Sequence, residues 1–502
     1  MSLAIVQTRA STGIKAPAVN VETHISNGLP SLSIVGLAEK EVKESRERVR
    51  SAILNSRFEF PIRRITINLA PADLPKQGGR FDLAIALGIL AASKQIPNDS
   101  LGSYEFIGEL GLSGELRPVS AILPFALEAY KANHKIILPA DNALEASLSQ
   151  HTMILPAKNI LQICSHLHAK EFLSPYKREF ETANTSAIQA DLADVFGQLH
   201  AKRALEIAAS GKHSLLLIGP PGTGKTMLAT RLMSLLPPLS DEEALEIATV
   251  RSISEKGFKL RDWKSAAFRS PHHTASSIAL VGGGSPPRPG EISLAHQGVL
   301  FLDELPEFNK QVLESLREPL ESGTITISRA ARQAEFPANF QLIAAMNPCP
   351  CGYLGSITNR CECSTTQIQR YHRKLSGPFL DRIDMQVRVD LIDKNHFLKK
   401  LPSETSATVR ARVQKARKKQ YYDRGILNNN LSGKALEKAC KLSKKDQAIL
   451  EKAFAEFQLS ARAYHRILRI ARTIADLTGC EQIQNPHLME ALSYRRSLFH
   501  SK

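Results

Sequence analysis

The sequence has 502 residues, of which 43% are hydrophobic and 23% are charged, and its formal net charge at pH 7 is +16. This composition excludes a disordered or fibrous protein, and the length predicts about three domains. No apolar run is long enough to span a membrane and the first residues lack the pattern of a secretory leader, so we expect a cytoplasmic protein with no membrane partner.

Three compositional regions follow one another along the chain. Residues 1–173 alternate short apolar runs such as RRITINLAP with helical stretches such as FDLAIALGILAAS, which indicates a mixed α/β domain. The polar stretch 174–190 is interpreted as a linker. Residues 191–393 alternate strand and helix signals again, and the apolar runs LLLI and VLFL predict buried parallel strands. Residues 394–502 show helical spacing and predict an all-helical domain.

The third region carries most of the net charge, with 23 Lys and Arg against 9 Asp and Glu. This asymmetry is typical of a protein that binds a polyanion such as nucleic acid, although a solvated basic helical face is the alternative. Tyr421 and Tyr422 lie among basic residues, which permits contact with a phosphate backbone and base stacking, with a solvated basic helix as the alternative. Arg466, Arg469 and Arg472 share one face of a predicted helix and are expected to contact another subunit or a polyanion.

A glycine-rich loop follows the apolar run LLLI in the string LLLIGPPGTGKT. Its G-x-x-x-x-G-K-T spacing, between a strand and a helix, is the pattern of a phosphate-binding loop. In such a loop the backbone N–H groups face the phosphates of ATP, Lys225 reaches the β and γ oxygens, and the Thr226 hydroxyl ligates Mg²⁺. The predicted nucleotide-binding residues of the loop are Gly219, Pro220, Pro221, Gly222, Thr223, Gly224, Lys225 and Thr226.

Polar side chains end two later strands of the same predicted sheet. The string VLFLDEL places Asp303 and Glu304 where the carboxyl end of a strand meets the loop. There Asp303 would hold Mg²⁺ and Glu304 would orient and deprotonate the attacking water, although an acidic pair that caps the next helix is the alternative. The string FQLIAAMNPC places Asn347 where its amide would position that water, but an Asn after a strand is also a common turn residue.

Four cysteines crowd into fifteen residues after Asn347, with the spacing C-x-C-x₉-C-x-C. Four soft ligands without an open position favour a structural tetrahedral Zn²⁺. Because C-x-C is tighter than the usual C-x₂-C, free reduced thiols or a redox pair are the alternative. The predicted zinc ligands are Cys349, Cys351, Cys361 and Cys363.

The strings GPPGTGKT, LFLDEL, AAMNPCPCG and SGPFLDRID together resemble the ComM/YifB family of magnesium-chelatase-like AAA+ ATPases. The resemblance extends over the whole chain, from AIVQTRASTGIKAPAVNVE to SARAYHRILRIARTIADL. It implies a Lon-protease-like N-terminal α/β domain, an AAA+ P-loop α/β core with a parallel sheet, and a C-terminal all-helical lid domain.

The resemblance also implies roles for three polar residues. Asn347 looks like sensor 1, Arg382 like the arginine finger that enters the neighbouring subunit's site, and Arg462 like sensor 2 from the helical lid. Since the finger is useful only in an oligomer, a homo-hexamer is implied. Considered without the resemblance, each of the two arginines would be expected to make a surface ion pair.

Two segments resemble the insertions that line the channel of the ring in this family. FRSPHHTASSIALVGGGSPPRPGEISLAHQG resembles the helix-2 insertion, and GTITISRAARQAEFPANF resembles the hairpin before sensor 1. Loop arginines contact a phosphate backbone without reading its sequence, so Arg288, Arg329 and Arg332 are the DNA-binding candidates. For the two hairpin arginines the alternative is an ion pair with Glu335 or Glu321.

Two further features are expected to carry no catalytic or metal chemistry. His272 and His273 lie in the first insertion, and adjacent side chains point apart in an extended chain, so we do not expect them to bind a metal. The serine and lysine positions of Lon-type proteases fall on Arg80 and Leu123, which excludes peptide hydrolysis. Arg80 beside Lys76 would form a basic loop for DNA, with ordinary solvated charges as the alternative.

The resemblance implies an ATP-driven hexameric helicase that promotes branch migration and aids the integration of incoming DNA in natural transformation. Its partners would be single-stranded and branched DNA and recombination proteins, and its cofactors ATP, Mg²⁺ and a structural Zn²⁺. A protein-remodelling or chelatase-type ATPase subunit and a degraded protease component are the alternatives. ATP hydrolysis stimulated by DNA would separate the helicase from both.

Overall fold

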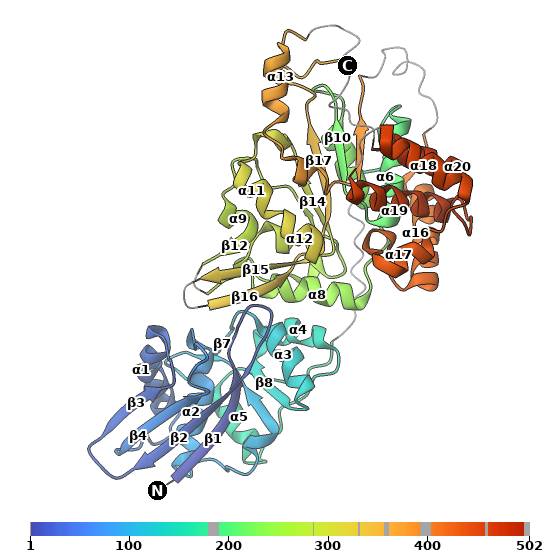
Figure 1. Cartoon of the computed structure of the whole chain (residues 1–502). Helices are drawn as coiled ribbons and strands as arrows, with labels where there is room; N and C mark the ends of the chain where they lie inside the picture. Colours follow the sequence, from blue (N-terminus) through green and yellow to red (C-terminus); the bar gives the residue numbers. More distant parts are fainter. Residues whose placement is uncertain are drawn as a thin grey trace.

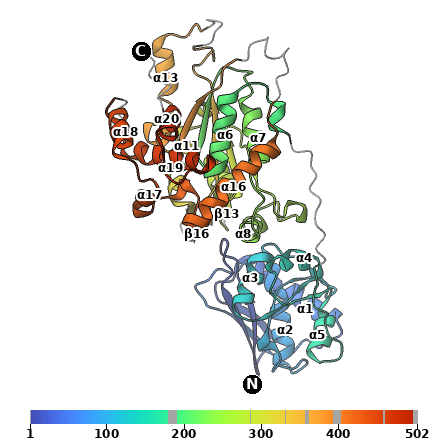
Figure 2. The ribbon, with the colours of Figure 1, turned by 90° about the vertical axis from the view of Figure 1, so that its right-hand side faces the viewer.

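The computed structural model describes residues 2–178, 190–284, 286–329, 332–355, 361–391, 403–456 and 460–495. Most of the predicted linker, residues 179–189, lies outside these ranges. The described residues up to 178 form one body, drawn in blue to cyan in Figure 1, and the described residues from 190 onward form a second body beside it (Figures 1 and 2).

The N-terminal body is built on a seven-stranded mixed sheet in the order β3-β4-β2-β1-β5-β8-β9. Helix α2 (Asp82–Ala92) contacts β1 and β2, and all eleven of its residues are buried, as expected of a helix that is apolar on every side. The predicted mixed α/β character is therefore confirmed. The remaining elements are β1 (Ser2–Arg9), β2 (Ala18–Ser26), β3 (Ser31–Val35), α1 (Lys40–Asn55), β4 (Arg64–Ala70), β5 (Tyr104–Phe106), β6 (Glu109–Leu110), β7 (Leu116–Arg117), α3 (Ile122–Lys131), β8 (Lys135–Pro139), α4 (Ala143–Ala146), β9 (Ile154–Ala157) and α5 (Ile160–Leu167).

The second body contains a five-stranded parallel sheet in the order β11-β14-β17-β10-β18. Alternate residues of β10 and β17 pack into hydrophobic clusters on opposite faces. Because both faces are covered, these two strands are apolar along their length except for Gln341 at the start of β17, and the predicted parallel sheet is confirmed. The strands are β10 (Leu215–Ile218), β11 (Phe268–Arg269), β14 (Val299–Leu302), β17 (Gln341–Met346) and β18 (Met385–Arg388).

Helices cover both faces of this sheet, and two short insertions interrupt it. The first insertion, between β11 and β14, forms α9 (Ser277–Val281), β12 (Gly282–Gly283), β13 (Arg288–Pro289) and α10 (Glu291–Leu294). The second is the hairpin β15 (Thr324–Arg329) and β16 (Arg332–Pro337), which lies alongside the N-terminal body (Figure 1). The other helices are α6 (Leu199–Gly211), α7 (Lys225–Leu235), α8 (Asp241–Ser252), α11 (Lys310–Ser315), α12 (Arg317–Ser322), α13 (Thr365–His372) and α14 (Gly377–Leu380).

The N-terminal body contacts both α8 and the hairpin. Leu123 of α3 is fully buried beside Ala248 of α8 in a small apolar cluster. The backbone N–H of Ala121 donates to the carbonyl oxygen of Ser252 at 3.3 Å. Gly13, in the turn between β1 and β2, lies so close to the hairpin that an added Cβ would be 3.3 Å from that of Ala334.

The C-terminal region is helical, as predicted. Its helices are α16 (Ser406–Arg424), α17 (Gly433–Ala439), α18 (Lys444–Glu456), α19 (Ala461–Leu477) and α20 (Asn485–Ser493). Helices α16 and α19 contact α6, so this region covers one face of the parallel sheet (Figure 2). Among the described residues, no helix is both long and apolar enough to cross a membrane.

Candidate nucleotide-binding site

The glycine-rich loop joins the end of β10 to the start of α7. Gly222 and Gly224 have φ angles of +76° and +84°, a left-handed conformation that favours glycine and forms a concave nest of N–H groups. Gly219 is required by a close approach, because a Cβ there would lie 2.1 Å from the carbonyl oxygen of Val389. Together with the helix N-terminus, this backbone fits the phosphates of a nucleotide.

Lys225 connects this loop to the neighbouring strand β17. Its Nζ donates to the carbonyl oxygens of Gly219 and Pro220 at 2.7 and 2.8 Å and to Oδ1 of Asn347 at 3.1 Å. Burial lowers the pKa of Lys225, and the carboxylates after β14 oppose that shift. Asn347 therefore lies at the phosphate loop, the position that its predicted role requires.

The acidic pair after β14 lies at the same edge of the sheet. The Thr226 hydroxyl donates to Oδ2 of Asp303 at 2.7 Å, so two hard oxygen ligands of the kind that Mg²⁺ prefers lie side by side. The backbone N–H of Glu304 donates to Oδ1 of Asp303 at 2.9 Å. The Glu304 side chain is 56% exposed and is thus accessible to water.

Arg382 and Arg462 do not reach the phosphate loop of their own chain. Strand β18 starts level with β10 in parallel register, and Arg382 precedes β18 whereas the loop follows β10. The arginine and the loop therefore lie at opposite edges of the sheet, separated by a four-residue strand of about 13 Å.

Both arginines instead converge on one carboxylate. Nη2 of Arg382 lies 2.6 Å from Oε1 of Glu321, and Nη2 of Arg462 lies 3.9 Å from the same atom. Arg382 also donates to the carbonyl oxygen of Pro378 at 2.7 Å, and burial lowers its pKa. Arg382, Arg462 and Glu321 line a polar cavity of about 580 Å³. A nucleotide contact by either arginine requires a second subunit.

The other arginines of α19 make contacts within their own chain. Arg466 pairs with the buried Asp384. Arg469 donates to the carbonyl oxygen of Leu431 at 2.7 Å and Arg472 to that of Cys480 at 2.6 Å. Arg472 is 1% exposed, so for this residue the expectation of a subunit or polyanion contact is wrong. Arg466 and Arg469 line the same polar cavity as Arg382, so for these two the expectation stays a prediction.

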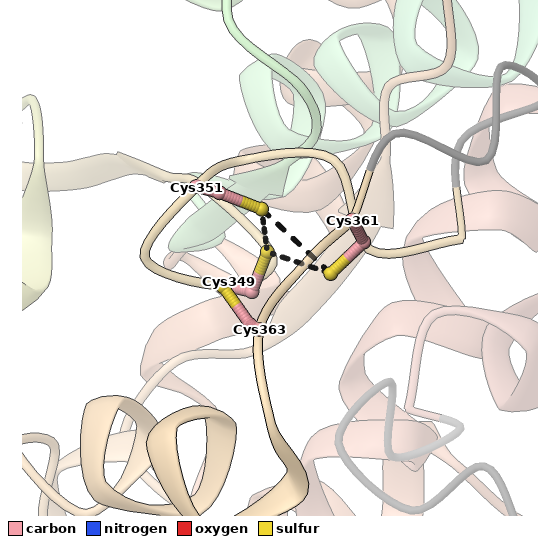
Figure 3. Close-up of side chains that lie close together, drawn as sticks. All are labelled: Cys349, Cys351, Cys361 and Cys363. Carbon is pink, nitrogen blue, oxygen red and sulfur yellow. Dashed lines mark hydrogen bonds between the residues drawn. The ribbon is translucent and has the colours of Figure 1, made fainter.

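Four cysteine thiols converge beside the nucleotide loop (Figure 3). All four Sγ atoms lie within 4.8 Å of one another, and three of the separations are 3.3, 3.7 and 3.7 Å. A tetrahedral Zn²⁺ with Zn–S bonds of about 2.3 Å places its sulfurs about 3.8 Å apart. The donor set therefore fits Zn²⁺. The cysteines are Cys349, Cys351, Cys361 and Cys363.

The cysteine loop packs directly against the phosphate loop. Gly352 has a φ of +86°, and a Cβ there would lie 2.7 Å from Cδ of Pro221 and 3.8 Å from Cγ of Asn347. His372 of α13 contacts the carbonyl oxygen of Pro348 at 2.8 Å. Any interaction that holds the four thiols together therefore also fixes the position of the cysteine loop against the phosphate loop.

The structure places the three DNA-binding candidates on the two insertions. Arg288 is exposed, and its Nη1 lies 3.1 Å from Oε1 of Glu255. Arg329 and Arg332 face each other across the end of the hairpin, but their side chains lie outside the described residues. Glu321, one of the expected partners of these two arginines, instead pairs with the arginines at the sheet edge.

The two residues that the resemblance to Lon-type proteases singles out, Arg80 and Leu123, lie where the N-terminal body meets the second body. Leu123 is buried under α8, and Arg80 donates to the carbonyl oxygen of Ser120 at 3.2 Å. Burial lowers the pKa of Arg80 to about 10. The predicted basic loop of Arg80 and Lys76 is wrong, because Lys76 is fully buried and donates to the carbonyl oxygen of Pro71.

One contact in the site was missed by the sequence reasoning. Nδ1 of His273 lies 3.1 Å from Oε2 of Glu304. The two residues follow strands β11 and β14, which are neighbours in the parallel sheet. Strand order is not readable from these short apolar runs, so the pair could not be predicted.

Models of one family match three parts of the chain. The model described as "Magnesium chelatase, subunit ChlI" matches residues 191–397. "Subunit ChlI of Mg-chelatase" matches residues 21–142, and "Magnesium chelatase, subunit ChlI C-terminal" matches residues 403–495. The matched ranges include the glycine-rich loop, both insertions and the C-terminal helices.

Individual relatives match over nearly the whole length. The chain is 52% identical over 499 residues to the competence protein ComM of Haemophilus influenzae, which covers 99% of this chain and 98% of the relative. It is 50% identical over 496 residues to the YifB protein of Escherichia coli, covering 99% and 97%. A shorter match, 25% identical over 226 residues, is to Lon protease 2 of Bacillus subtilis. The chain belongs to the ComM/YifB family of magnesium-chelatase-like AAA+ ATPases.

Proposed function

We propose that the chain is an ATP-driven DNA motor that assembles as a homo-hexamer and promotes branch migration. The observation that carries this proposal is the position of Arg382 at the sheet edge opposite the phosphate loop, because the two can meet only between subunits. The relative whose name is competence protein supports a role in natural transformation, in which incoming DNA is integrated. Recombination proteins in the cytoplasm would be its partners.

Within one subunit, the groups at the carboxyl edge of the sheet have separate roles in ATP hydrolysis. Lys225 would bind the β and γ phosphates, and Thr226 and Asp303 would hold Mg²⁺, which would neutralise phosphate charge. Glu304 orients and deprotonates the attacking water, and Asn347 positions that water. The contacts between Lys225 and Asn347 and between Thr226 and Asp303 support these roles.

Between subunits, the polar cavity at the edge of the sheet opposite the phosphate loop provides two positively charged side chains for the neighbouring nucleotide. Arg382 and Arg462 lie together there and share Glu321 as their acidic partner. When a neighbouring nucleotide enters the cavity, its phosphates replace this carboxylate as the partner of the two guanidinium groups. Hydrolysis is thereby linked to subunit contact, as a motor built as a ring requires.

DNA binding is assigned to the two insertions. Arginines on loops bind the phosphate backbone without reading bases, which suits a motor that moves along any sequence. Arg288 is exposed on the first insertion, and Arg329 and Arg332 end the hairpin. The exposed Tyr422 on the basic helix α16 offers a stacking surface outside the insertions.

Replacing Arg329 and Arg332 together with Ala tests this assignment. Two lost contacts with single-strand phosphates lower the slope of log affinity against log salt by about 1.4 and reduce DNA-stimulated ATP hydrolysis. The matched control is Arg63→Ala with Arg64→Ala, which removes the same charge from an exposed site on the N-terminal body. Equal DNA affinity and stimulation in both double variants would exclude the hairpin arginines from DNA binding.

We assign the four cysteines to a structural Zn²⁺ that braces the nucleotide site. The expected result is one zinc per chain by elemental analysis, lost in a Cys361→Ser/Cys363→Ser variant together with a lower melting temperature, because metal binding contributes to folding. ATP affinity falls as well, since Gly352 of the cysteine loop packs on Pro221. Cys480→Ser, outside the cluster, keeps its zinc. Purified protein without zinc would contradict the assignment.

A chelatase-type or protein-remodelling subunit is the second candidate, favoured by the family models described as magnesium chelatase. Such a subunit hydrolyses ATP in response to a protein partner rather than DNA. ATP hydrolysis that is indifferent to single-stranded and branched DNA would support this second candidate.

A further inference from the structure

A small cavity lies at the edge of the parallel sheet where the strands begin, away from the phosphate loop of the same chain. Its volume is about 100 Å³. Its walls include Lys212 before β10, Gln297 before β14, Asn339 before β17 and Arg417 on α16. Since a far smaller volume already holds one water molecule, this cavity has room for one phosphate-sized anion.

Two cations line this cavity and contact only neutral oxygens. Nζ of Lys212 donates to Oε1 of Gln297 at 2.9 Å and to the carbonyl oxygen of Asn339 at 3.1 Å. Nε of Arg417 donates to the carbonyl oxygen of Ala209 at 2.8 Å. Among the residues that the structure describes, no carboxylate oxygen lies within 4.0 Å of a side-chain nitrogen of Lys212 or Arg417. Both charges therefore lack a direct counterion.

The two charges also disfavour each other. The pKa of Lys212 is lowered to about 8, mainly by burial and in addition by the charge of Arg417. Burial lowers the pKa of Arg417 to about 10. Glu243, the carboxylate in the described lining, opposes both shifts, but it already accepts the backbone N–H of Ser240 at 2.9 Å. More distantly, Glu246 opposes the shift of Lys212, and Tyr421 that of Arg417.

We propose that this cavity is a binding site for a phosphate-type oxyanion. The anion accepts hydrogen bonds from Nζ of Lys212 and from the two Nη groups of Arg417, which the bond from Nε to Ala209 leaves available. Such charge-assisted bonds are stronger than the present bonds to neutral oxygens. The anion also removes the repulsion between the two cations, so its binding stabilises the fold.

Two sources supply an oxyanion of this kind, namely free inorganic phosphate and the backbone of DNA. The small volume favours free phosphate, because a nucleic-acid strand follows an extended groove. Lys212 and Asn339 also line the cavity that contains Arg382. Phosphate released from a neighbouring nucleotide would therefore pass directly beside this site. Only this last step rests on the proposed function; the binding of the anion does not.

Calorimetric titration with inorganic phosphate tests the site, at constant ionic strength and with a saturating non-hydrolysable ATP analogue and Mg²⁺ in the phosphate loop. The unaltered protein binds phosphate, and phosphate raises its melting temperature more than chloride does at the same ionic strength. Arg417→Gln and Lys212→Gln each weaken phosphate binding by at least about tenfold, because each removes a charge-assisted hydrogen bond. Lys418→Gln, which removes an exposed charge from the same helix, changes it by less than about twofold.

Absence of phosphate binding by the unaltered protein overturns the proposal. Phosphate affinities of the Arg417→Gln and Lys212→Gln variants within about twofold of the original also overturn it. A loss of binding in Arg462→Gln but not in Arg417→Gln overturns it as well, because the anion would then lie in the neighbouring cavity. Arg417 also holds the carbonyl oxygen of Ala209, so Lys212→Gln repeats the test with that bond intact.

The affinity for single-stranded DNA distinguishes the two sources of the anion. With free phosphate as the ligand, Arg417→Gln and Lys418→Gln bind DNA equally well, and inorganic phosphate at constant ionic strength does not displace DNA. A loss of DNA affinity in Arg417→Gln that matches its loss of phosphate affinity assigns the site to a backbone phosphate instead. Absence of DNA binding by the unaltered protein contradicts the proposed motor, and the phosphate titration still decides the site.

Discussion

Replacing Glu304 with Gln is expected to lower kcat for ATP hydrolysis by about 10²- to 10⁴-fold, the usual contribution of a general base. The amide keeps the shape of the side chain but cannot accept the proton of the attacking water. Binding of ATP is retained, because the phosphates contact Lys225 and the backbone N–H groups of the loop. The measurement combines steady-state hydrolysis with the affinity for a fluorescent ATP analogue.

The control for this substitution lies three residues later in the chain. Glu307 pairs with Lys374 at 3.0 Å and is about as exposed as Glu304, so Glu307→Gln removes a neighbouring carboxylate outside the predicted chemistry. Its kcat stays within about twofold. A Glu304→Gln variant that hydrolyses ATP at more than a tenth of the original rate would show that another group is the base.

Arg382→Ala is expected to lower ATP hydrolysis by the assembled protein by about 10³- to 10⁵-fold, the range known for arginine fingers. The guanidinium group stabilises charge that develops on the γ-phosphate of the neighbouring subunit. Arg382→Lys restores little, because an ammonium group lacks the planar fork of donors. Melting temperature and oligomeric state are measured in parallel, since Arg382 also contacts Glu321 and Pro378 within its own chain.

Mixing two inactive variants separates a role between subunits from a role within one. An Arg382→Ala subunit keeps an intact phosphate loop, and a Lys225→Ala subunit keeps an intact finger. A mixed ring therefore contains junctions with both groups, and its activity exceeds that of either variant alone. A mixture that stays as inactive as its components would place the function of Arg382 inside its own chain.

Much of the carboxyl edge of the sheet could be predicted from local patterns. LLLIGPPGTGKT encodes a strand, a turn that needs positive φ and a helix start within twelve residues, and the structure has these elements in that order. Asp303 and Asn347 each end an apolar run, and parallel strands bring such ends together. The clustering of the four cysteines also follows from their short spacing.

Features that depend on packing between distant segments could not be predicted. Arg472 looks like part of a free basic stripe, because nothing in the spacing of the α19 arginines shows that its side chain is buried. Lys76 looks exposed beside Arg80 for the same reason. The pairing of His273 with Glu304 requires the order of strands in the sheet, which the sequence does not reveal.

The measurement that tests the central claim most directly is ATP-dependent branch migration on a labelled four-strand DNA junction, with Lys225→Ala as the variant that lacks phosphate-loop function. The account predicts strand movement by the unaltered protein with ATP and none by the variant. ATP hydrolysis by the unaltered protein without any strand movement would contradict a DNA motor and favour a protein-remodelling ATPase.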